Sequence, residues 1–259
     1  MGDIFFSLRA FVSHWLNKED RFSQQSPFVF QTYSGLRHFL NQNKKGNPEI
    51  EAFRASLLQD HEYIEVLDLG AGSKKVPQAL RPISKITRYS TSNSKFAQLY
   101  QYFCGMTPAE YVLELGTCMG ISTRYLDAQT RGKLFTFEGS EQIQKIAQRR
   151  PLPPKTNFIL GPIEQTLPQT LQSIPKVDFA LIDANHTYDG TISAFRAILP
   201  RLQPTSIVAI GDPHWTPGME RVWEEIKALP EVKLTLDFFE CGIVFFDFPG
   251  EKSHLILDV

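Results

Sequence analysis

The feature that most constrains this chain is a short apolar run followed by two spaced glycines, within residues 111–123. The run includes Glu114, Gly116 follows two positions later, and Gly120 comes four positions after that. Residues 121–128 then read as a helix. This order predicts a strand, a tight turn and a helix N-terminus, where unpaired backbone N–H groups and the Ser122 hydroxyl can face an anionic group. The sequence therefore predicts a loop that binds a nucleotide-like cofactor.

The spacing of the glycines narrows the choice of cofactor. A dinucleotide-binding loop has the pattern Gly-x-Gly-x-x-Gly, whereas three residues separate Gly116 from Gly120 and no third glycine follows at the required distance. A P-loop is also excluded, because no Gly-Lys-Ser/Thr follows. A second acid, Glu138, closes the next apolar run at residues 133–137. A carboxylate in that position can accept hydrogen bonds from both hydroxyls of a ribose.

The pattern Glu114-x-Gly116-x-x-x-Gly120-x-Ser122, followed by Thr136-Phe137-Glu138-Gly139, resembles the class I S-adenosylmethionine-dependent methyltransferases, especially the small-molecule O-methyltransferases of the catechol type. The resemblance covers roughly residues 108–248. It implies S-adenosylmethionine as the cofactor and a small-molecule hydroxyl as the methyl acceptor. It also implies a set of cofactor-binding residues: Glu114, Gly116, Thr117, Cys118, Gly120, Ser122, Glu138, Gly139, Gly161, Ile163 and Asp183.

From Tyr111 onward, apolar strand candidates alternate with helical patterns. The strands are expected at residues 111–115, 133–137, 157–160, 177–182, 206–210, 232–238 and 242–246, and the helices at 121–128, 141–149, 163–173, 191–202 and 218–229. Such alternation predicts an α/β fold with a Rossmann-like, doubly wound, mostly parallel sheet of seven strands. The last two strands have no helix between them. They must therefore form an antiparallel pair, so the last strand of the sheet is antiparallel.

The residues before this alternation predict an N-terminal helical extension or lid at 1–107, followed by the methyltransferase domain at 108–259. Apolar residues at helical spacing between Ile4 and Leu16 form one stripe, interrupted by Arg9 and without a small-residue cleavage site, so we do not expect a signal peptide. We expect this helix to dock on its own domain or on a dimer mate, with attachment to a membrane surface as the alternative. Ser26 and Pro27 predict the start of a helix to Leu40, and a further helix is expected at residues 49–58.

A second glycine loop, at residues 65–73, matches the first methyltransferase motif at least as well as the later copy does. No strand ending in an acid follows Gly72 at the required distance, whereas every later element follows Gly116 on schedule. We therefore favour the later copy as the cofactor loop. Asp68–Gly72 is then either a surface turn in the extension or part of a lid or substrate wall over the active site.

The ligand of such a sheet lies outside the carboxyl ends of its strands, so polar residues at those ends are candidates for the site. Gly161 and Ile163 follow the third strand, and in the resembled family this position lines the adenine. Asp183 ends the fourth strand and His186 follows it, while Asp212 and His214 follow the fifth. In the resembled enzymes this first aspartate lies near the methionine part of the cofactor and can bind a metal. We expect all four residues to be catalytic and both imidazoles to project into the cavity.

The sequence departs from the resembled family at the metal position. Metal-dependent enzymes of the catechol type place an Asp-Asn pair after the fifth strand, whereas Pro213 follows Asp212 here. Asp183 and Asp212 could still bind Mg²⁺, but two carboxylates without a third ligand make a weak site. We therefore do not favour a required metal. A metal-independent reaction needs a histidine, His186 or His214, to accept the hydroxyl proton.

Composition limits the partners. Lys and Arg number 27 against 28 Asp and Glu, the net charge is −1, and the basic residues are scattered, so a nucleic-acid partner is not expected. Three cysteines without ligand spacing suggest a reducing compartment, and we expect a cytoplasmic protein with no membrane span. The acceptor is expected to be a small molecule, its pocket shaped by residues such as Tyr100, Tyr102, Phe103 and Met106, although core packing is the alternative for each of them. A non-catalytic binding module, and an enzyme with N-methylation or hydroxylase-like chemistry, stay open as alternatives.

Overall fold

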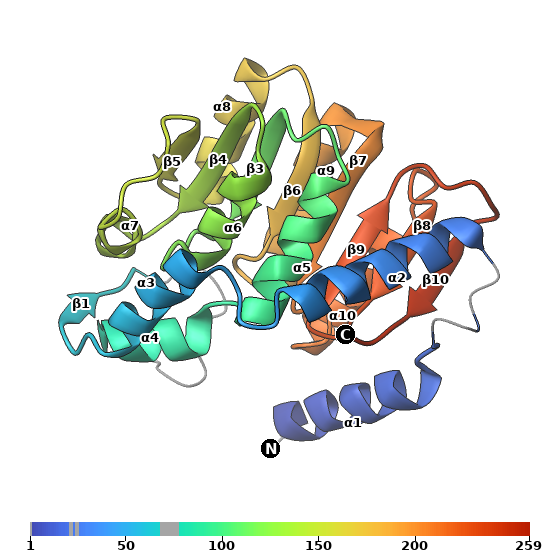
Figure 1. Cartoon of the computed structure of the whole chain (residues 1–259), viewed down its shortest axis with the longest axis horizontal. Helices are drawn as coiled ribbons and strands as arrows, with labels where there is room; N and C mark the ends of the chain where they lie inside the picture. The colour runs from blue at the N-terminus through green and yellow to red at the C-terminus, as the bar shows by residue number, and fades with distance from the viewer. Residues whose placement is uncertain (1, 21–22, 24–25, 68–77) are drawn as a thin grey trace.

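The structure is a computed structural model that describes residues 2–20, 23, 26–67 and 78–259. Eight strands form its main sheet (Figure 1): β3 (Tyr111–Leu115), β4 (Lys133–Glu138), β5 (Thr156–Leu160), β6 (Val177–Ile182), β7 (Leu202–Gly211), β8 (Leu234–Asp237), β9 (Cys241–Phe245) and β10 (Ser253–Ile256). Their order is β10-β8-β9-β7-β6-β3-β4-β5. The chain thus runs outward from β3 to β5 and then crosses to β6 on the other side of β3. Ligands bind at such a reversal of strand order.

The predicted mostly parallel, doubly wound sheet is confirmed, and the number of strands is one higher than expected. Strands β3 to β7 are parallel to one another. Strand β9 is antiparallel to both β7 and β8, as the short connection before it predicted. The strand missed is β10, which pairs in parallel with β8 at the edge of the sheet. Its four residues, Ser-His-Leu-Ile, are mostly half-buried and show no alternating apolar pattern, so nothing in the sequence distinguished them from a loop.

Helices cover both faces of this sheet. After the parallel strands come α6 (Ile121–Gln129), α7 (Glu141–Ala147), α8 (Ile163–Ser173), α9 (Tyr188–Ile198) with the 3-10 turn η1 (Leu199–Arg201), and α10 (Pro217–Ala228). One face packs against α8, α9 and α10, with Phe195 and Trp223 fully buried there. The other face packs against α2 (Pro27–Gln42), α5 (Ser94–Gly105) and α6 (Figure 1).

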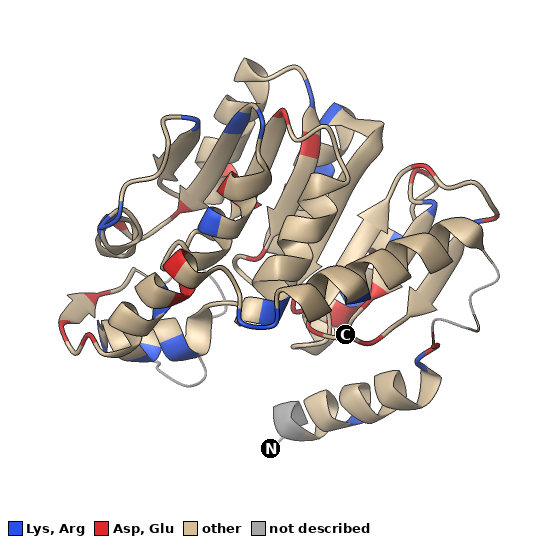
Figure 2. Ribbon diagram, viewed as in Figure 1, with Lys and Arg blue, Asp and Glu red and all other residues tan. Residues whose placement is uncertain are grey.

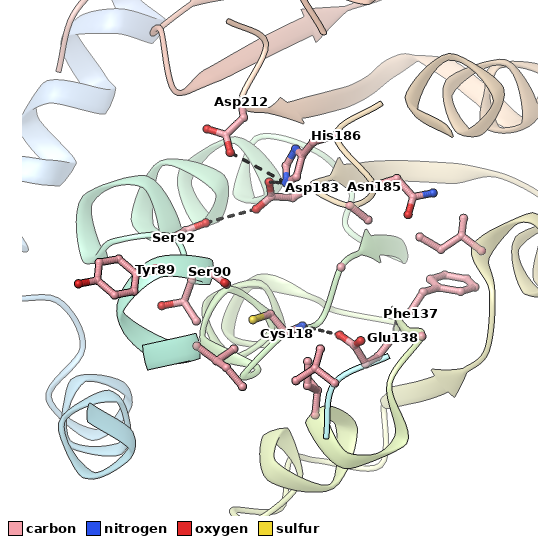
Figure 3. Close-up of a pocket in the computed structure, with 18 of the residues that line it drawn as sticks. Tyr89, Ser90, Ser92, Cys118, Phe137, Glu138, Asp183, Asn185, His186 and Asp212 are labelled. Atoms are coloured by element: carbon pink, nitrogen blue, oxygen red, sulfur yellow. Dashed lines mark hydrogen bonds and ion pairs between the residues drawn. The ribbon is translucent and has the colours of Figure 1, made fainter. Parts of the chain in front are cut away.

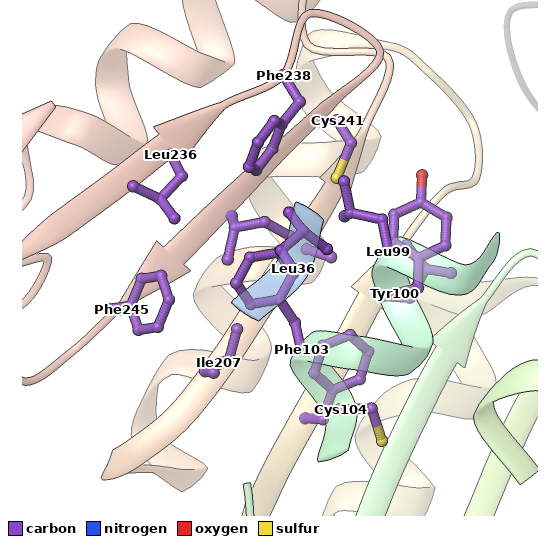
Figure 4. Close-up of a cluster of buried hydrophobic side chains, with 14 of the residues drawn as sticks. Leu36, Leu99, Tyr100, Phe103, Cys104, Ile207, Leu236, Phe238, Cys241 and Phe245 are labelled. Carbon is purple, nitrogen blue, oxygen red and sulfur yellow. The ribbon is translucent and has the colours of Figure 1, made fainter. Parts of the chain in front are cut away.

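The core on the second face is rich in aromatic side chains from α5 (Figure 4). Phe103 is fully buried, and its ring centroid lies 6.0 Å from that of Phe245 and 6.3 Å from that of Phe238. Tyr100 lies on the same helix, and its hydroxyl bonds to the Cys241 thiol near the carboxyl end of β7. Phe103 thus packs α5 into the core, whereas Tyr100 of the same helix lies at the carboxyl end of the parallel strands.

The N-terminal part contains the expected helices and an unexpected small sheet. Its helices are α1 (Gly2–Asn17), α2, α3 (Pro48–Leu58) and α4 (Ile83–Ser90), and its strands β1 (Tyr63–Glu65) and β2 (Leu80–Pro82) pair antiparallel. The start of α2 is confirmed, since the Ser26 hydroxyl accepts a hydrogen bond from the Val29 N–H and Pro27 takes the first helical position. Ile50, Phe53 and Leu57 of α3 join a cluster with residues of α6 and α7, so this part packs beside the glycine loop. Within the described ranges, no helix is long and apolar enough to cross a membrane.

Candidate functional site

A cavity of about 670 Å³ opens at the carboxyl ends of the parallel strands. This volume lies in the range of small-molecule and cofactor sites. The strand ends supply one wall: Gly116 and Cys118 after β3, Glu138 and Gly139 at the end of β4, Gly161 and Ile163 after β5, Asp183 and His186 after β6, and Asp212 and Trp215 after β7. The N-terminal part supplies the facing wall, through Val66, Leu67, Arg81, Ile86, residues 88–93, Phe96 and Tyr100.

The turn after β3 has the geometry that the glycine spacing predicted. Gly116 has φ +107° and Gly120 has φ +70°, which favour glycine. A Cβ on Gly116 would lie 2.3 Å from the Asp183 carbonyl oxygen, so a side chain there would push β3 and β6 apart. The backbone of the neighbouring strand end is thus what requires glycine at this position. Gly120 lies away from the cavity, against Ala147 of α7.

Three of the residues expected to bind the cofactor, Glu114, Thr117 and Ser122, lie behind the turn and do not line the cavity. Glu114 is fully buried, and the hydroxyls of Thr123 and Thr136 donate hydrogen bonds to its Oε2 at 2.5 and 2.6 Å. Burial raises the pKa of this carboxyl to about 7, although its hydroxyl partners lower it. These contacts join β3, α6 and β4 beneath the turn.

Two backbone N–H groups hold the Glu138 carboxylate in place at the cavity wall. Its Oε2 accepts a hydrogen bond from the Cys118 N–H and its Oε1 one from the Ser140 N–H, both at 2.9 Å (Figure 3). The carboxylate is thus held between the turn after β3 and the start of α7. Gly139, Gly161 and Ile163 line the cavity beside it, and Gly161 has φ +130°.

At the other end of the cavity, Asp183, His186 and Asp212 converge (Figure 3). The His186 Nε2 lies 3.8 Å from Asp183 Oδ1 and 4.0 Å from Asp212 Oδ2, and one ligand atom from each residue lies within 4.8 Å of the others. His186 and Asp212 have φ of +44° and +51°. Such left-handed backbone is costly for non-glycine residues and is concentrated at functional sites. The sequence offered only two carboxylates as ligands for a metal. The structure places the His186 imidazole beside them as a possible third ligand.

Charge is concentrated at this end. Desolvation, together with the nearby carboxylates of Asp183 and Glu240, raises the pKa of Asp212 to about 6, although His186 acts to lower it. The His186 ring also lies edge-on to Trp215, with centroids 5.3 Å apart. A group that binds here contacts partly desolvated acidic side chains on one side and the Trp215 ring on the other.

The expectation that both imidazoles face the cavity is wrong for His214. This side chain is only two residues from Asp212, but its Nε2 bonds to Asp237 Oδ2 at 2.8 Å and its ring stacks on Phe239. The Trp223 Nε1–H donates to the same carboxylate, and His14 of α1 lies 3.3 Å from its other oxygen. Although burial alone would raise it, these hydrogen bonds hold the pKa of Asp237 well below its usual range. His214 is thus part of a buried cluster beneath the loop that carries Asp212.

Sequence reasoning missed the end of α4 and the short segment that joins it to α5. Tyr89, Ser90 and Ser92 line the cavity, and the Ser92 hydroxyl donates to Asp183 Oδ2 at 3.4 Å (Figure 3). The Ser/Thr-rich composition of residues 88–94 was the available signal. Of the four residues expected to shape an acceptor pocket, only Tyr100 lines the cavity. The other three lie elsewhere: Phe103 is in the core and Met106 is on the surface. The Tyr102 hydroxyl donates a hydrogen bond to the Thr32 carbonyl.

The second glycine loop falls partly outside the structure. Asp68–Gly72 lies among residues 68–77, which are outside the described residues. Val66 and Leu67, which come just before it, line the cavity on the side opposite the strand ends.

The sequence and the structure were compared with known protein families and solved structures. Residues 113–213 match a family model described as a methyltransferase domain. Against proteins of curated function, the sequence finds no match. Among solved structures, the chain resembles SAH-bound methyltransferase PaMTH1 of Podospora anserina, with 16% identity and a TM-score of 0.59 over 87% of this chain and 100% of that one. It also resembles cofactor-bound Rv0187 from MTB, with 15% identity and a TM-score of 0.58 over 82% and 95% of the two chains.

A third structure, the SAM complex of the O-methyltransferase TomG from Streptomyces achromogenes, has 16% identity and a TM-score of 0.52 over 62% of this chain and 83% of that one. At these identities the likeness is one of fold. The family match begins within β3 and ends directly after Asp212, so it spans the glycine turn, Glu138 and the three converging side chains. Residues 113–213 therefore match a methyltransferase domain, in a chain that shares the fold of solved methyltransferase structures.

Proposed function

We propose that this protein is an S-adenosylmethionine-dependent O-methyltransferase that acts on a hydroxyl group of a small molecule. The observation that carries the proposal is that one cavity holds the Gly116 turn and Glu138 at one end and Asp183, His186 and Asp212 at the other. The first end suits a nucleoside. The second end offers groups that can orient a hydroxyl and accept its proton.

The residues at the first end fit the cofactor. Glu138 would accept hydrogen bonds from the ribose hydroxyls, because two backbone N–H groups already hold its carboxylate toward the cavity. Gly161 and Ile163 would line the adenine, and Asp183 would lie beside the methionine part. Glu114, Thr117, Gly120 and Ser122 would act by shaping the turn, since they lie outside the cavity wall.

When bound, S-adenosylmethionine supplies a methyl group on a sulfonium, which is already a strong electrophile. The residues of this chain then need to align the acceptor oxygen and to remove its proton. We assign proton removal to His186, whose Nε2 faces the cluster between the two aspartates. Asp183 and Asp212 would stabilise the imidazolium that forms, because their carboxylate oxygens lie 3.8 and 4.0 Å from the Nε2 that takes up the proton.

The same three side chains favour a second mechanism. A divalent cation held by Asp183, His186 and Asp212 would lower the pKa of the acceptor hydroxyl instead of a base removing its proton. Two carboxylates suit Mg²⁺, whereas an imidazole is more typical of transition metals. We therefore keep the histidine base as the first proposal and the metal as the second.

The acceptor is proposed to be a small molecule because aromatic side chains line the space beside the cluster. Tyr89, Tyr100 and Trp215 line it, and residues 1–107 would thus act as the extension that closes the site over the domain at 108–259. In the view of Figure 2, Lys and Arg are scattered among acidic residues over the described part of the chain, an arrangement that does not favour a nucleic-acid partner. The three cysteines are free, which fits a cytoplasmic site of action.

The test combines binding with turnover. Calorimetry should show that S-adenosylmethionine and its demethylated product both bind the purified chain. A screen of small phenols and alcohols with mass detection should then find one that gains a CH₂ unit. Binding without transfer to any acceptor would favour a non-catalytic binding protein, and transfer only to amines would replace O-methylation by N-methylation.

A further inference from the structure

The helix α1 shows its apolar side to solvent. The side chains turned toward the body of the protein are buried or half-buried, and they include one aromatic residue beside small or polar ones: Phe6, Ser7, Ala10 and His14. On the opposite side lies a stripe of large apolar side chains, which we call the α1 stripe: Phe5, Leu8, Val12, Trp15 and Leu16. Phe5 is 69% exposed, Leu16 67% and Trp15 56%. A surface helix of a monomer is ordinarily arranged the other way round, with its apolar side toward the core.

Specific contacts hold the helix in this orientation. The Phe11 ring lies edge-on to Phe239, with centroids 5.3 Å apart, and the buried His14 contacts Asp237. The chain after the helix is also fixed, because Lys18 pairs with Asp258 at 2.6 Å. Figure 1 shows α1 lying apart from the other helices, below α2 and β10. The α1 stripe is therefore presented outward by a docked helix.

The composition of α1 decides what covers the stripe. A helix that lies on a membrane surface usually has a polar side rich in Lys and Arg, but α1 carries a single Arg and a single Asp. Phe5, Leu8, Val12 and Trp15 are spaced alternately by three and four residues, which is the seam spacing of paired helices. An uncharged seam of this kind is self-complementary, as a two-fold symmetric contact requires.

We propose that the α1 stripe is the contact surface of a homodimer, in which α1 packs along α1 of a second copy of this chain. A helix of 16 residues is about 24 Å long, so each seam offers two heptads of contact. Five large apolar side chains from each copy would supply the apolar centre that such an interface needs. The sequence offered a dimer mate as one of the partners for this helix, and the α1 stripe would give that partner a defined surface.

The test measures oligomeric state by sedimentation velocity on the full chain, from roughly 1 to 100 µM. The wild type should sediment as a dimer in the upper part of this range. Trp15→Lys and Leu8→Lys each place a charge on the seam of both copies and should weaken dimerisation about tenfold or more. Ser13→Lys is the matched control, because it adds the same charge to an exposed position on the same helix but off the stripe. It should leave the dimer intact.

Circular dichroism and calorimetry with S-adenosylmethionine show whether each variant is folded. A wild type that stays monomeric throughout the range would overturn the proposal. So would a dimer that persists in both Trp15→Lys and Leu8→Lys. A third overturning result is a wild type that cosediments with phosphatidylcholine–phosphatidylserine vesicles while Trp15→Lys does not, because the stripe would then serve a lipid surface.

Discussion

At the scale of single residues, Glu138 offers the sharpest test of the cofactor end. Its carboxylate is held by the Cys118 and Ser140 N–H groups, so it meets a ligand with little reorganisation. Glu138→Gln keeps the shape but removes the charge-assisted acceptor, and we expect S-adenosylmethionine to bind more weakly by about 1–3 kcal/mol in calorimetry. Glu141→Gln, an exposed acid of the neighbouring helix, is the control and should bind normally. Equal affinity in both variants would remove Glu138 from the cofactor site.

The two histidines give the second prediction at this scale. His186 lies between two carboxylates in the cavity, whereas His214 is committed to Asp237 outside it. We expect His186→Asn to lower kcat by about 10²–10⁴ at an unchanged cofactor affinity, and His214→Asn to lower stability more than kcat. Because a base must be neutral to accept a proton, the rate of the wild type should fall as the pH is lowered.

EDTA separates the two mechanisms in the same assay. A histidine base predicts turnover in EDTA, with Mg²⁺ adding little. Loss of activity in EDTA, restored by Mg²⁺ and accompanied by little effect of His186→Asn, would put Asp183 and Asp212 at the centre of a metal mechanism.

At the scale of elements, one buried carboxylate joins three segments. Asp237 at the end of β8 bonds to His14 of α1, to His214 of the loop after β7 and to Trp223 of α10. Its pKa is held below the ordinary value, so its ionised form stabilises the folded state. That stability is present above the unfolded pKa of about 3.9 and is lost as the pH falls toward the lower folded pKa.

Asp237→Asn should therefore lower the free energy of unfolding by roughly 3 kcal/mol at neutral pH, the order observed for breaking a buried ion pair. Urea titrations at pH 7 and at pH 3 test this, and the gap between wild type and variant should narrow at the lower pH. Glu224→Gln is the control, since that exposed carboxylate pairs with Lys227 on the surface of α10 and should matter by less than about 1 kcal/mol. A gap that is independent of pH would show that the hydrogen-bonded shape of Asp237, and not its charge, holds the segments together.

Elements with a strong apolar pattern could be predicted from the sequence. Features that depend on tertiary packing, such as an edge strand or the direction of a loop side chain, could not. The strands β3 and β6 were predicted to the residue because both are mostly apolar segments buried in the middle of a sheet, each with a single acidic residue. The edge strand β10 has no such run. Glu138 was found because it ends a strand, whereas Ser92 belongs to a different part of the chain and reaches Asp183 only through the packing of α5 on the sheet. His214 was misplaced because sequence distance does not determine which side of a loop a side chain takes.

At the scale of the whole molecule, the cavity lies between two stretches of chain that are far apart in sequence. Val66, Arg81 and Ile86 form one wall, and the strand ends form the other. A ligand that fills this space contacts both, so its binding free energy should stabilise both. The proposed division into an extension at 1–107 and a domain at 108–259 then has a measurable consequence, namely that the cofactor couples the two parts.

Hydrogen exchange can measure this coupling. With the demethylated cofactor at about 100 times its dissociation constant, the folded state should gain about 2.7 kcal/mol. We expect slower exchange in β3 to α6, and equally in α4 and the segment after it, which belong to the extension. The helix α10 lies on the far face of the sheet and serves as the internal control, because it should slow only as far as global unfolding limits its exchange. Protection confined to residues 113–213 would mean that the extension does not close over the cofactor, and the aromatic wall formed by Tyr89 and Tyr100 would then have to act on the acceptor alone.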